Sequence, residues 1–115
     1  MLFRSINQGD IVSVDFPFSD GTETKRRPAL VLSRAAVHAT GDVLLMQITS
    51  KSKRDGLSMA LEDNAVSPHL PLKSFLRLHK VFTLDHQLVV RKIAHLERSK
   101  FNEAIQALFV LLKSE

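Results

Sequence analysis

Short runs in which apolar and polar residues alternate, each bounded by a turn signal, constrain this chain most. Val12, Val14 and Phe16 alternate with polar residues near the start. A period of two residues is typical of a strand with one buried face. Other alternating or apolar runs predict strands at 28–33, 42–50, 57–61, 72–83 and, after a short turn, within 85–96. Segments 17–27 and 64–71 are rich in polar residues and turn formers and predict loops.

Only the last part of the chain repeats with the period of a helix. Phe101, Ile105, Leu108 and Leu112 recur at spacings of three and four residues, and polar residues occupy other positions. This spacing predicts one amphipathic helix, over 98–113, that packs on the sheet. Several short strands followed by one helix predict a small, strongly bent antiparallel barrel.

Length and composition set broad limits. A chain of 115 residues corresponds to one domain, so we expect residues 1–115 to fold as one unit. Cysteine is absent, which excludes disulfides and thiolate metal sites. The longest wholly apolar run, Leu108–Leu112, is far too short to span a bilayer, and the first residues have no signal-peptide pattern. We therefore expect a cytoplasmic protein without a membrane partner.

The charge balance is basic, with a formal net charge of +4 and an isoelectric point of about 9.8. Such an excess favours an anionic partner, such as a nucleic acid or an acidic protein segment. A soluble basic protein without that partner has the same balance. The position of the basic residues therefore matters more than their number.

Two basic clusters lie where loops are predicted. Lys25, Arg26 and Arg27 end the first loop, and the planar guanidinium group suits a pair of phosphate oxygens. The second cluster follows the strand 42–50, and its hydroxyl and cationic groups can donate to phosphate oxygens. This second cluster consists of Thr49, Ser50, Lys51, Lys53 and Arg54. Each cluster alone is equally compatible with a well-solvated loop.

Arg77 and His79 are two residues apart and are predicted to share one face of the strand 72–83. An arginine beside an imidazole can handle both charge and proton in phosphoryl transfer, because histidine titrates near neutral pH. A structural role for the histidine is the alternative. The five histidines lack the short spacings of zinc ligands, and the carboxylates form no cluster suited to magnesium. No metal or other cofactor is therefore expected.

Several blocks, in order along nearly the whole chain, resemble those of one protein family, the MazF/PemK toxins. Three are similar to the signature blocks of that family: Gly9-Asp10-Ile11-Val12, Arg27-Pro28-Ala29-Leu30-Val31-Leu32-Ser33 and Ile48-Thr49-Ser50. The later strand of the family is matched by Leu72-Lys73-Ser74, Arg77, Lys80 and Thr83-Leu84. The C-terminal amphipathic segment lies in the corresponding place.

This resemblance implies an SH3-like or CcdB-like antiparallel β-barrel with helices, which forms a homodimer and binds RNA in a groove on the dimer. It implies a sequence-specific, metal-independent endoribonuclease that cleaves single-stranded mRNA to 2′,3′-cyclic phosphate and 5′-hydroxyl ends. It also implies a cognate antitoxin whose disordered, often acidic tail lies over the groove. The basic loops suit such a tail.

The resemblance also implies roles for single residues. Arg27 matches the catalytic arginine that precedes proline in the family, and Thr49 matches its threonine at the end of the third strand. Thr22 matches a hydroxyl residue that contacts RNA. Some PemK-like members carry an arginine and an aspartate in the later strand. Arg77 matches the arginine, whereas His79 stands in place of the aspartate.

Cyclising cleavage requires that the 2′-hydroxyl loses a proton, that the leaving 5′-oxygen gains one, and that charge on the phosphorane is stabilised. We assign the phosphorane charge to Arg27 and a hydrogen bond to a nonbridging oxygen to Thr49. By hypothesis His79 is the proton donor or acceptor, while Arg77 tunes it and holds phosphate. Phe18 can stack on an unpaired base or pack against the barrel.

Two other classes of function stay open. A toxin of the CcdB type would use the same barrel to bind a protein target such as gyrase. A non-cleaving barrel would bind RNA or DNA and leave it intact. We favour the nuclease because Arg27 and Thr49 both fall on catalytic positions of the family.

Overall fold

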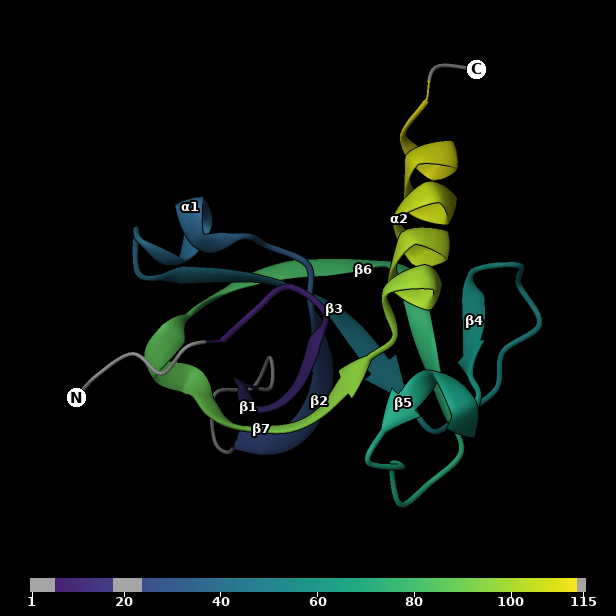
Figure 1. The fold of residues 1–115 in the computed structure, drawn as a ribbon, viewed down its shortest axis with the longest axis horizontal. Helices are drawn as coiled ribbons and strands as arrows, with labels where there is room; N and C mark the ends of the chain where they lie inside the picture. Colours follow the sequence, from purple (N-terminus) through teal and green to yellow (C-terminus); the bar gives the residue numbers. More distant parts are fainter. Residues whose placement is uncertain (1–5, 18–23, 114–115) are drawn as a thin grey trace.

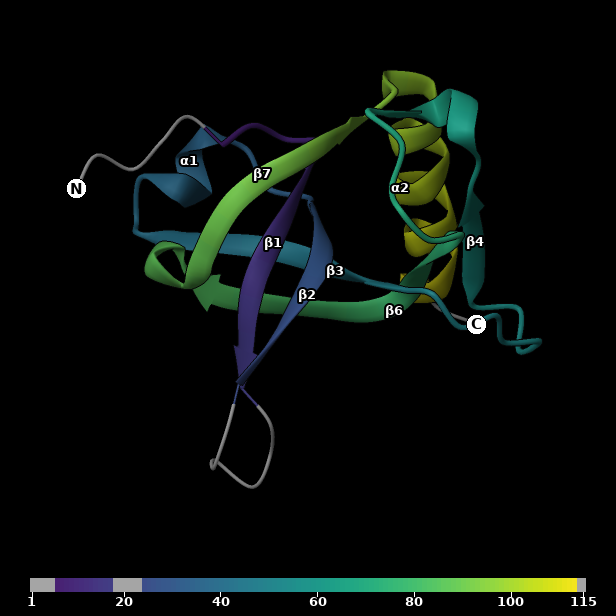
Figure 2. The ribbon, with the colours of Figure 1, turned by 90° about the horizontal axis from the view of Figure 1, so that it is seen from below.

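Seven strands in the described part of the chain form one strongly curved antiparallel sheet, which closes into half of a barrel (Figures 1 and 2). The computed structural model describes residues 6–17 and 24–113. The strands lie side by side in the order β4-β6-β3-β2-β1-β7-β5. They are β1 (Asp10–Pro17), β2 (Thr24–Val31), β3 (Asp42–Thr49), β4 (Ser58–Leu61), β5 (Val66–Ser67), β6 (Ser74–Asp85) and β7 (Val89–Leu96). The predicted fold class, mainly β with a C-terminal helix, is confirmed.

The first loop is shorter than predicted, because β2 begins at Thr24. Strands β1 and β2 pair from Ile11↔Leu30 to Pro17↔Thr24, so the basic residues 25–27 belong to the sheet. Their side chains are exposed, and the alternation rule detects a strand only when one face is apolar. The prediction of a loop over 17–27 is therefore wrong at its end.

Strand β6 is the longest and does not pair evenly with β3. The register moves from Met46↔Val81 to Ile48↔Leu76, so a step of two residues along β3 corresponds to a step of five along β6. Extra residues of this kind interrupt the ladder and bend a strand. Regular alternation of side chains is therefore lost around residues 77–80.

Helix α2 (Arg98–Leu112) begins against the sheet and extends away from it toward the C-terminus (Figure 1). Phe101 and Ala104, in its first half, are buried in the core. The predicted helix over 98–113 is confirmed to within one residue. Its end exposes the apolar side chains of Phe109, Val110, Leu111 and Leu112.

Three short helical segments complete the described chain: α1 (Ala35–His38), η1 (Asp63–Ala65) and η2 (His86–Leu88). Segment η2 is the turn predicted before the last strand. Helix α1 is not predicted, since one turn is too short to show periodicity. Segment η1 and the two-residue β5 occupy part of the predicted loop 64–71. No helix in residues 6–17 and 24–113 is long and apolar enough to cross a membrane.

The curved sheet separates two apolar clusters. Ile11 and Leu30 belong to the cluster that also contains Phe101 and Ala104 of α2, whereas their neighbours along the strands belong to the other cluster. This is the alternation that the pattern in β1 predicts. The second cluster consists of Val12, Val14, Ala29, Val31, Val43 and Leu45.

A fully buried carboxylate, that of Asp10, joins β1 to β7. Its Oδ1 lies 2.8 Å from Nδ1 of His95 and 3.2 Å from Nζ of Lys92. Its Oδ2 accepts a 2.8 Å hydrogen bond from the backbone N–H of Asn7. A buried charge is tolerated when it is paired and hydrogen-bonded in this way.

Replacing Phe101 by alanine is expected to lower the free energy of unfolding by about 3–5 kcal/mol, because it leaves a cavity where α2 meets the sheet. Phe101 is 3 % exposed. Gln106→Ala on the same helix is the control, since Gln106 is exposed and its loss costs about 0.5 kcal/mol or less. Urea denaturation at one protein concentration measures both. Equal losses would contradict the packing of α2.

Candidate functional site

A cavity of about 290 Å³ opens on the sheet at the start of β2 and the end of β3. Strands β1 and β7 and the segment 70–74 form its remaining walls. Its polar lining consists of Ser13, Arg26, Arg27, Thr49, Ser50, Ser74 and Arg91. Its apolar lining consists of Pro28, Ile48, Leu70, Pro71, Leu72 and Ile93.

Arg27 and Thr49, two of the four residues predicted to carry catalysis, both line this cavity. Strands β2 and β3 are antiparallel, and Ala29 pairs with Gln47. Continuing this register by two residues sets Arg27 opposite Thr49, because residues that oppose each other across a sheet share a side. The register of the two strands therefore accounts for Arg27 and Thr49 lining the same cavity.

The guanidinium groups of the cavity differ in their pairing. Nε of Arg26 lies 3.2 Å from Oδ1 of Asp15 in an exposed ion pair. Neither Arg27 nor Arg91 forms a hydrogen bond or ion pair within the described chain. Two cations are thus left to bind an anion from solution.

The hydroxyl of Thr49 is able to donate a hydrogen bond to a ligand. Its Oγ1 accepts a 3.1 Å hydrogen bond from the backbone N–H of Lys51. A hydroxyl has one proton and two lone pairs, so accepting this bond leaves the O–H group able to donate. Thr49 is half-buried, as a group that lines a cavity must be.

The other predicted RNA-binding residues are only partly gathered here. Arg26 and Ser50 line the cavity. Four more, Lys25, Lys51, Lys53 and Arg54, are exposed but are not part of its lining. Phe18 and Thr22 lie outside the described residues.

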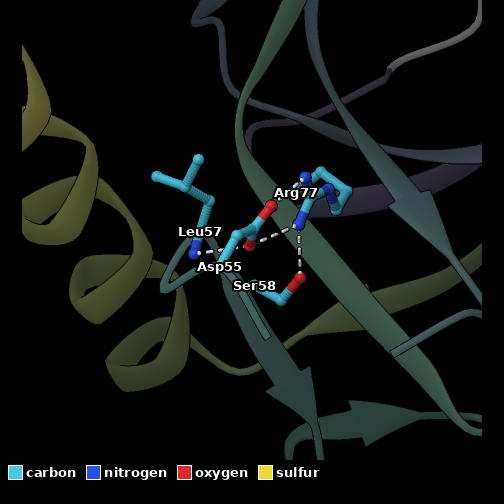
Figure 3. Close-up of polar contacts among 4 residues, drawn as sticks. All are labelled: Asp55, Leu57, Ser58 and Arg77. Carbon is cyan, nitrogen blue, oxygen red and sulfur yellow. Dashed lines mark hydrogen bonds and ion pairs between the residues drawn. The ribbon is translucent and has the colours of Figure 1, made fainter. Parts of the chain in front are cut away.

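Arg77 lies in a different environment from the one predicted (Figure 3). Its Nη1 and Nη2 donate to the two carboxylate oxygens of Asp55, at 3.1 and 2.9 Å, and Nη1 also donates to Oγ of Ser58 at 2.7 Å. The side chain is 7 % exposed and is not part of the cavity lining. The guanidinium that we predict to hold phosphate therefore holds the end of the loop 50–57.

Asp55 is fixed in turn by its own loop. Its Oδ1 accepts a 3.0 Å hydrogen bond from the backbone N–H of Leu57. The hydrogen bonds from Arg77 lower the pKa of Asp55 well below its usual range, and the same bonds raise the pKa of Arg77. Both groups are thus charged throughout the ordinary pH range.

His79 is exposed and is not part of the cavity lining. The common face predicted for Arg77 and His79 is wrong, because the irregular pairing of β6 with β3 turns Arg77 into the protein and leaves His79 outside. A catalytic pair of these two residues does not form within the chain.

Arg91 is the charged cavity residue that sequence reasoning missed. It lies in β7, in the segment 85–96, where the pattern predicts a strand only in part. The adjacent basic pair Arg91-Lys92 inside an otherwise apolar run was the available signal. Which member faces the cavity depends on two irregularities in the pairing of β1 with β7, and these are not visible in the sequence.

Within residues 6–17 and 24–113, no group of three or more histidine, aspartate or glutamate side chains is placed to hold a metal ion.

Comparison with known proteins decides the family. Residues 7–112 match the family model of the PemK-like, MazF-like toxins of type II toxin-antitoxin systems. The chain belongs to this family. No curated protein sequence matches the chain significantly.

Solved structures of MazF proteins share the fold. The chain is 27 % identical to a chain in a MazE–MazF crystal structure (form II) from Deinococcus radiodurans, with a TM-score of 0.77, and the match covers 93 % of this chain and 95 % of that one. MazF alone from the same organism (form I) gives 26 % identity, a TM-score of 0.74 and coverages of 93 % and 96 %. Toxin MazF-mt6 from Mycobacterium tuberculosis gives 19 % identity, a TM-score of 0.72 and coverages of 92 % and 98 %, a likeness of fold alone.

Asp55→Asn is expected to destabilise the toxin at neutral pH and to change how its stability depends on pH. Because the pKa of Asp55 is lowered in the folded state, its charge stabilises the fold above the pKa of an unfolded aspartate, about 4. That contribution is lost as the pH falls through the lower folded pKa. The difference in the free energy of unfolding between the parent protein and Asp55→Asn should therefore become smaller below about pH 4.

Urea denaturation between about pH 2 and pH 7 measures this difference. Asp42→Asn, which removes an exposed carboxylate from β3, is the matched control and should differ from the parent by a small, constant amount. A difference that stays constant for Asp55→Asn as well would contradict the role given to Arg77.

Proposed function

We propose that this toxin is a metal-independent endoribonuclease that cleaves single-stranded RNA at specific sequences. The observation that supports the proposal is one cavity that is lined both by Arg27, without a side-chain partner in the described chain, and by Thr49, whose hydroxyl can donate. These are the group types needed to stabilise charge on a phosphorane: a planar cation and a neutral donor.

In the proposed reaction the 2′-oxygen of the RNA attacks the adjacent phosphorus, a P–O2′ bond forms and the P–O5′ bond breaks. The products are a 2′,3′-cyclic phosphate and a 5′-hydroxyl, so no water is consumed. The 2′-hydroxyl loses one proton and the 5′-oxygen gains one. Arg27 and Ser50 are exposed at the rim, so solvent can accept and return these protons.

Single-stranded RNA is the proposed substrate because in-line attack requires a splayed backbone, and unpaired bases expose their edges for reading. The basic residues around the cavity suit a polyanion. Cleavage of mRNA in the cytoplasm would inhibit growth, as expected of a toxin.

We further propose that the toxin forms a homodimer and is silenced by a cognate antitoxin. The similar MazF from Deinococcus radiodurans was crystallised with MazE. The apolar end of α2, exposed in the single chain, supports association with another chain, because contiguous exposed apolar surface marks interaction sites. The basic rim of the cavity suits an acidic antitoxin tail.

Arg27→Ala is expected to lower kcat for RNA cleavage about a hundred- to a thousandfold, the usual cost of removing one transition-state donor. Cleavage of a long RNA in EDTA, with mapping of the new ends, measures it. Arg34→Ala is the matched control, since Arg34 is exposed at the start of α1, outside the cavity, and its loss changes the charge equally.

Each alternative predicts a different outcome of that experiment. A non-cleaving barrel would retain RNA in a salt-dependent way and leave it intact. A toxin of the CcdB type would bind a protein target with RNA and Arg27 both irrelevant. Cleavage that proceeds unchanged in Arg27→Ala would refute the assignment of the site.

His79→Gln tests the predicted acid–base role. Because His79 is outside the cavity lining, we expect the variant to keep the parent's cleavage rate from about pH 5 to pH 9, the range in which a histidine titrates. Single-turnover rates across this range measure it. If the single-turnover rate of the variant no longer changes with pH on the acidic or the basic side, His79 has the acid–base role.

A further inference from the structure

Arg91 enters the cavity from a strand that the proposed chemistry does not use. In the sheet, Ser13 of β1 pairs with Pro28 of β2 on one side and with Arg91 of β7 on the other. Neighbouring strands lie about 4.8 Å apart, so the backbones that carry Arg27 and Arg91 are separated by about 10 Å. Both arginines line the cavity, Arg27 from β2 and Arg91 from β7.

The surface that completes this cavity is apolar. Leu70, Leu72 and Ile93 belong to it, and Leu72 is 64 % exposed although it is a large aliphatic side chain. An exposed leucine in a cavity lined by two arginines that lack partners within the described chain is unfavourable for a surface that contacts only water. A ligand that combines anionic groups with a flat apolar face would satisfy both.

We propose that the cavity is a binding site for one nucleotide, in which Arg91 holds the phosphate next to the scissile one and the base lies against Leu70 and Leu72. The inference rests on the proposed RNA cleavage, because Arg27 takes the scissile phosphate. A strand of RNA presents phosphates at regular intervals with a base between them, which matches two cations and an apolar wall. Arg91 is thus a substrate-positioning residue, not a catalytic one.

The first test is Arg91→Ala, measured by steady-state cleavage at several salt concentrations. KM should rise about tenfold, as for one lost charge-assisted contact, with kcat retained. The slope of log KM against log salt concentration should fall by about 0.7, the value for one phosphate contact with a single strand. Arg34→Ala, with the same change of charge outside the cavity, should alter neither quantity.

Arg91→Lys separates charge from geometry. The ammonium keeps the charge and should restore the salt slope, while KM recovers only in part because the planar fork is lost. Urea denaturation of each variant identifies any unfolding, which is not expected for an exposed side chain. A fall in kcat equal to that of Arg27→Ala would overturn the proposal, because both arginines would then act on one phosphate.

The second test concerns the base. RNA oligonucleotides with an abasic site on either side of the cleaved bond should be poorer substrates than intact RNA at one of the two positions. Leu72→Ser should remove that difference, whereas Val37→Ser, at an exposed position of α1 outside the cavity, should preserve it. The same abasic penalty in parent and Leu72→Ser would overturn the apolar contact.

A noncleavable RNA with 2′-deoxyribose at the scissile nucleotide separates this inference from the proposed function. If it binds in an Arg91-dependent way although natural RNA stays intact, the nucleotide site stands and the nuclease fails. If natural RNA is cleaved and Arg91→Ala changes neither KM nor the salt slope, the nuclease stands and the nucleotide site fails. Dependence on Arg91 for an acidic antitoxin peptide alone would likewise overturn it.

Discussion

The pairing of β2 between β1 and β3 is the constraint on which the rest of the site depends. Through it, a cation at the start of one strand and a hydroxyl at the end of the next come to share one cavity. Backbone hydrogen bonds set this arrangement, so it needs no contact between the two side chains themselves. The backbone of Arg27 is consequently fixed by the sheet, while its guanidinium has no partner within the described residues and can act on a developing negative charge.

The loop that leaves β3 is fastened at both of its ends. At the first, the hydroxyl of Thr49 accepts from the backbone of Lys51; at the other, Asp55 accepts from Leu57 and from Arg77. Groups that are ordered before the substrate arrives lose less freedom on binding. Arg77 therefore fixes the far end of the loop that begins at Ser50 in the cavity lining, and the extra residues in β6 accompany its inward position.

Sequence periodicity predicts most elements here because each strand of the half-barrel buries one face, and α2 buries one stripe. It fails where polar residues continue a strand, as at residues 25–27, and where an irregularity changes the facing of a residue, as at Arg77. Arg27 and Thr49 are predicted from blocks of sequence that resemble those of a known family, since nothing in their local sequence shows that they line one cavity. Arg91 was missed because its facing depends on the irregular pairing of β7, a property of the folded sheet.

The carboxylate of Asp10 limits how this chain can vary in length. It is buried with His95 and Lys92 of β7 as partners. Adding or deleting one residue in β7 would move Lys92 and His95 to other positions. A negative charge would then be left unpaired in the interior, at a cost of several kcal/mol. Insertions that natural or engineered variants tolerate should therefore fall in exposed turns away from β7, while the pairing of β1 with β7 keeps its spacing.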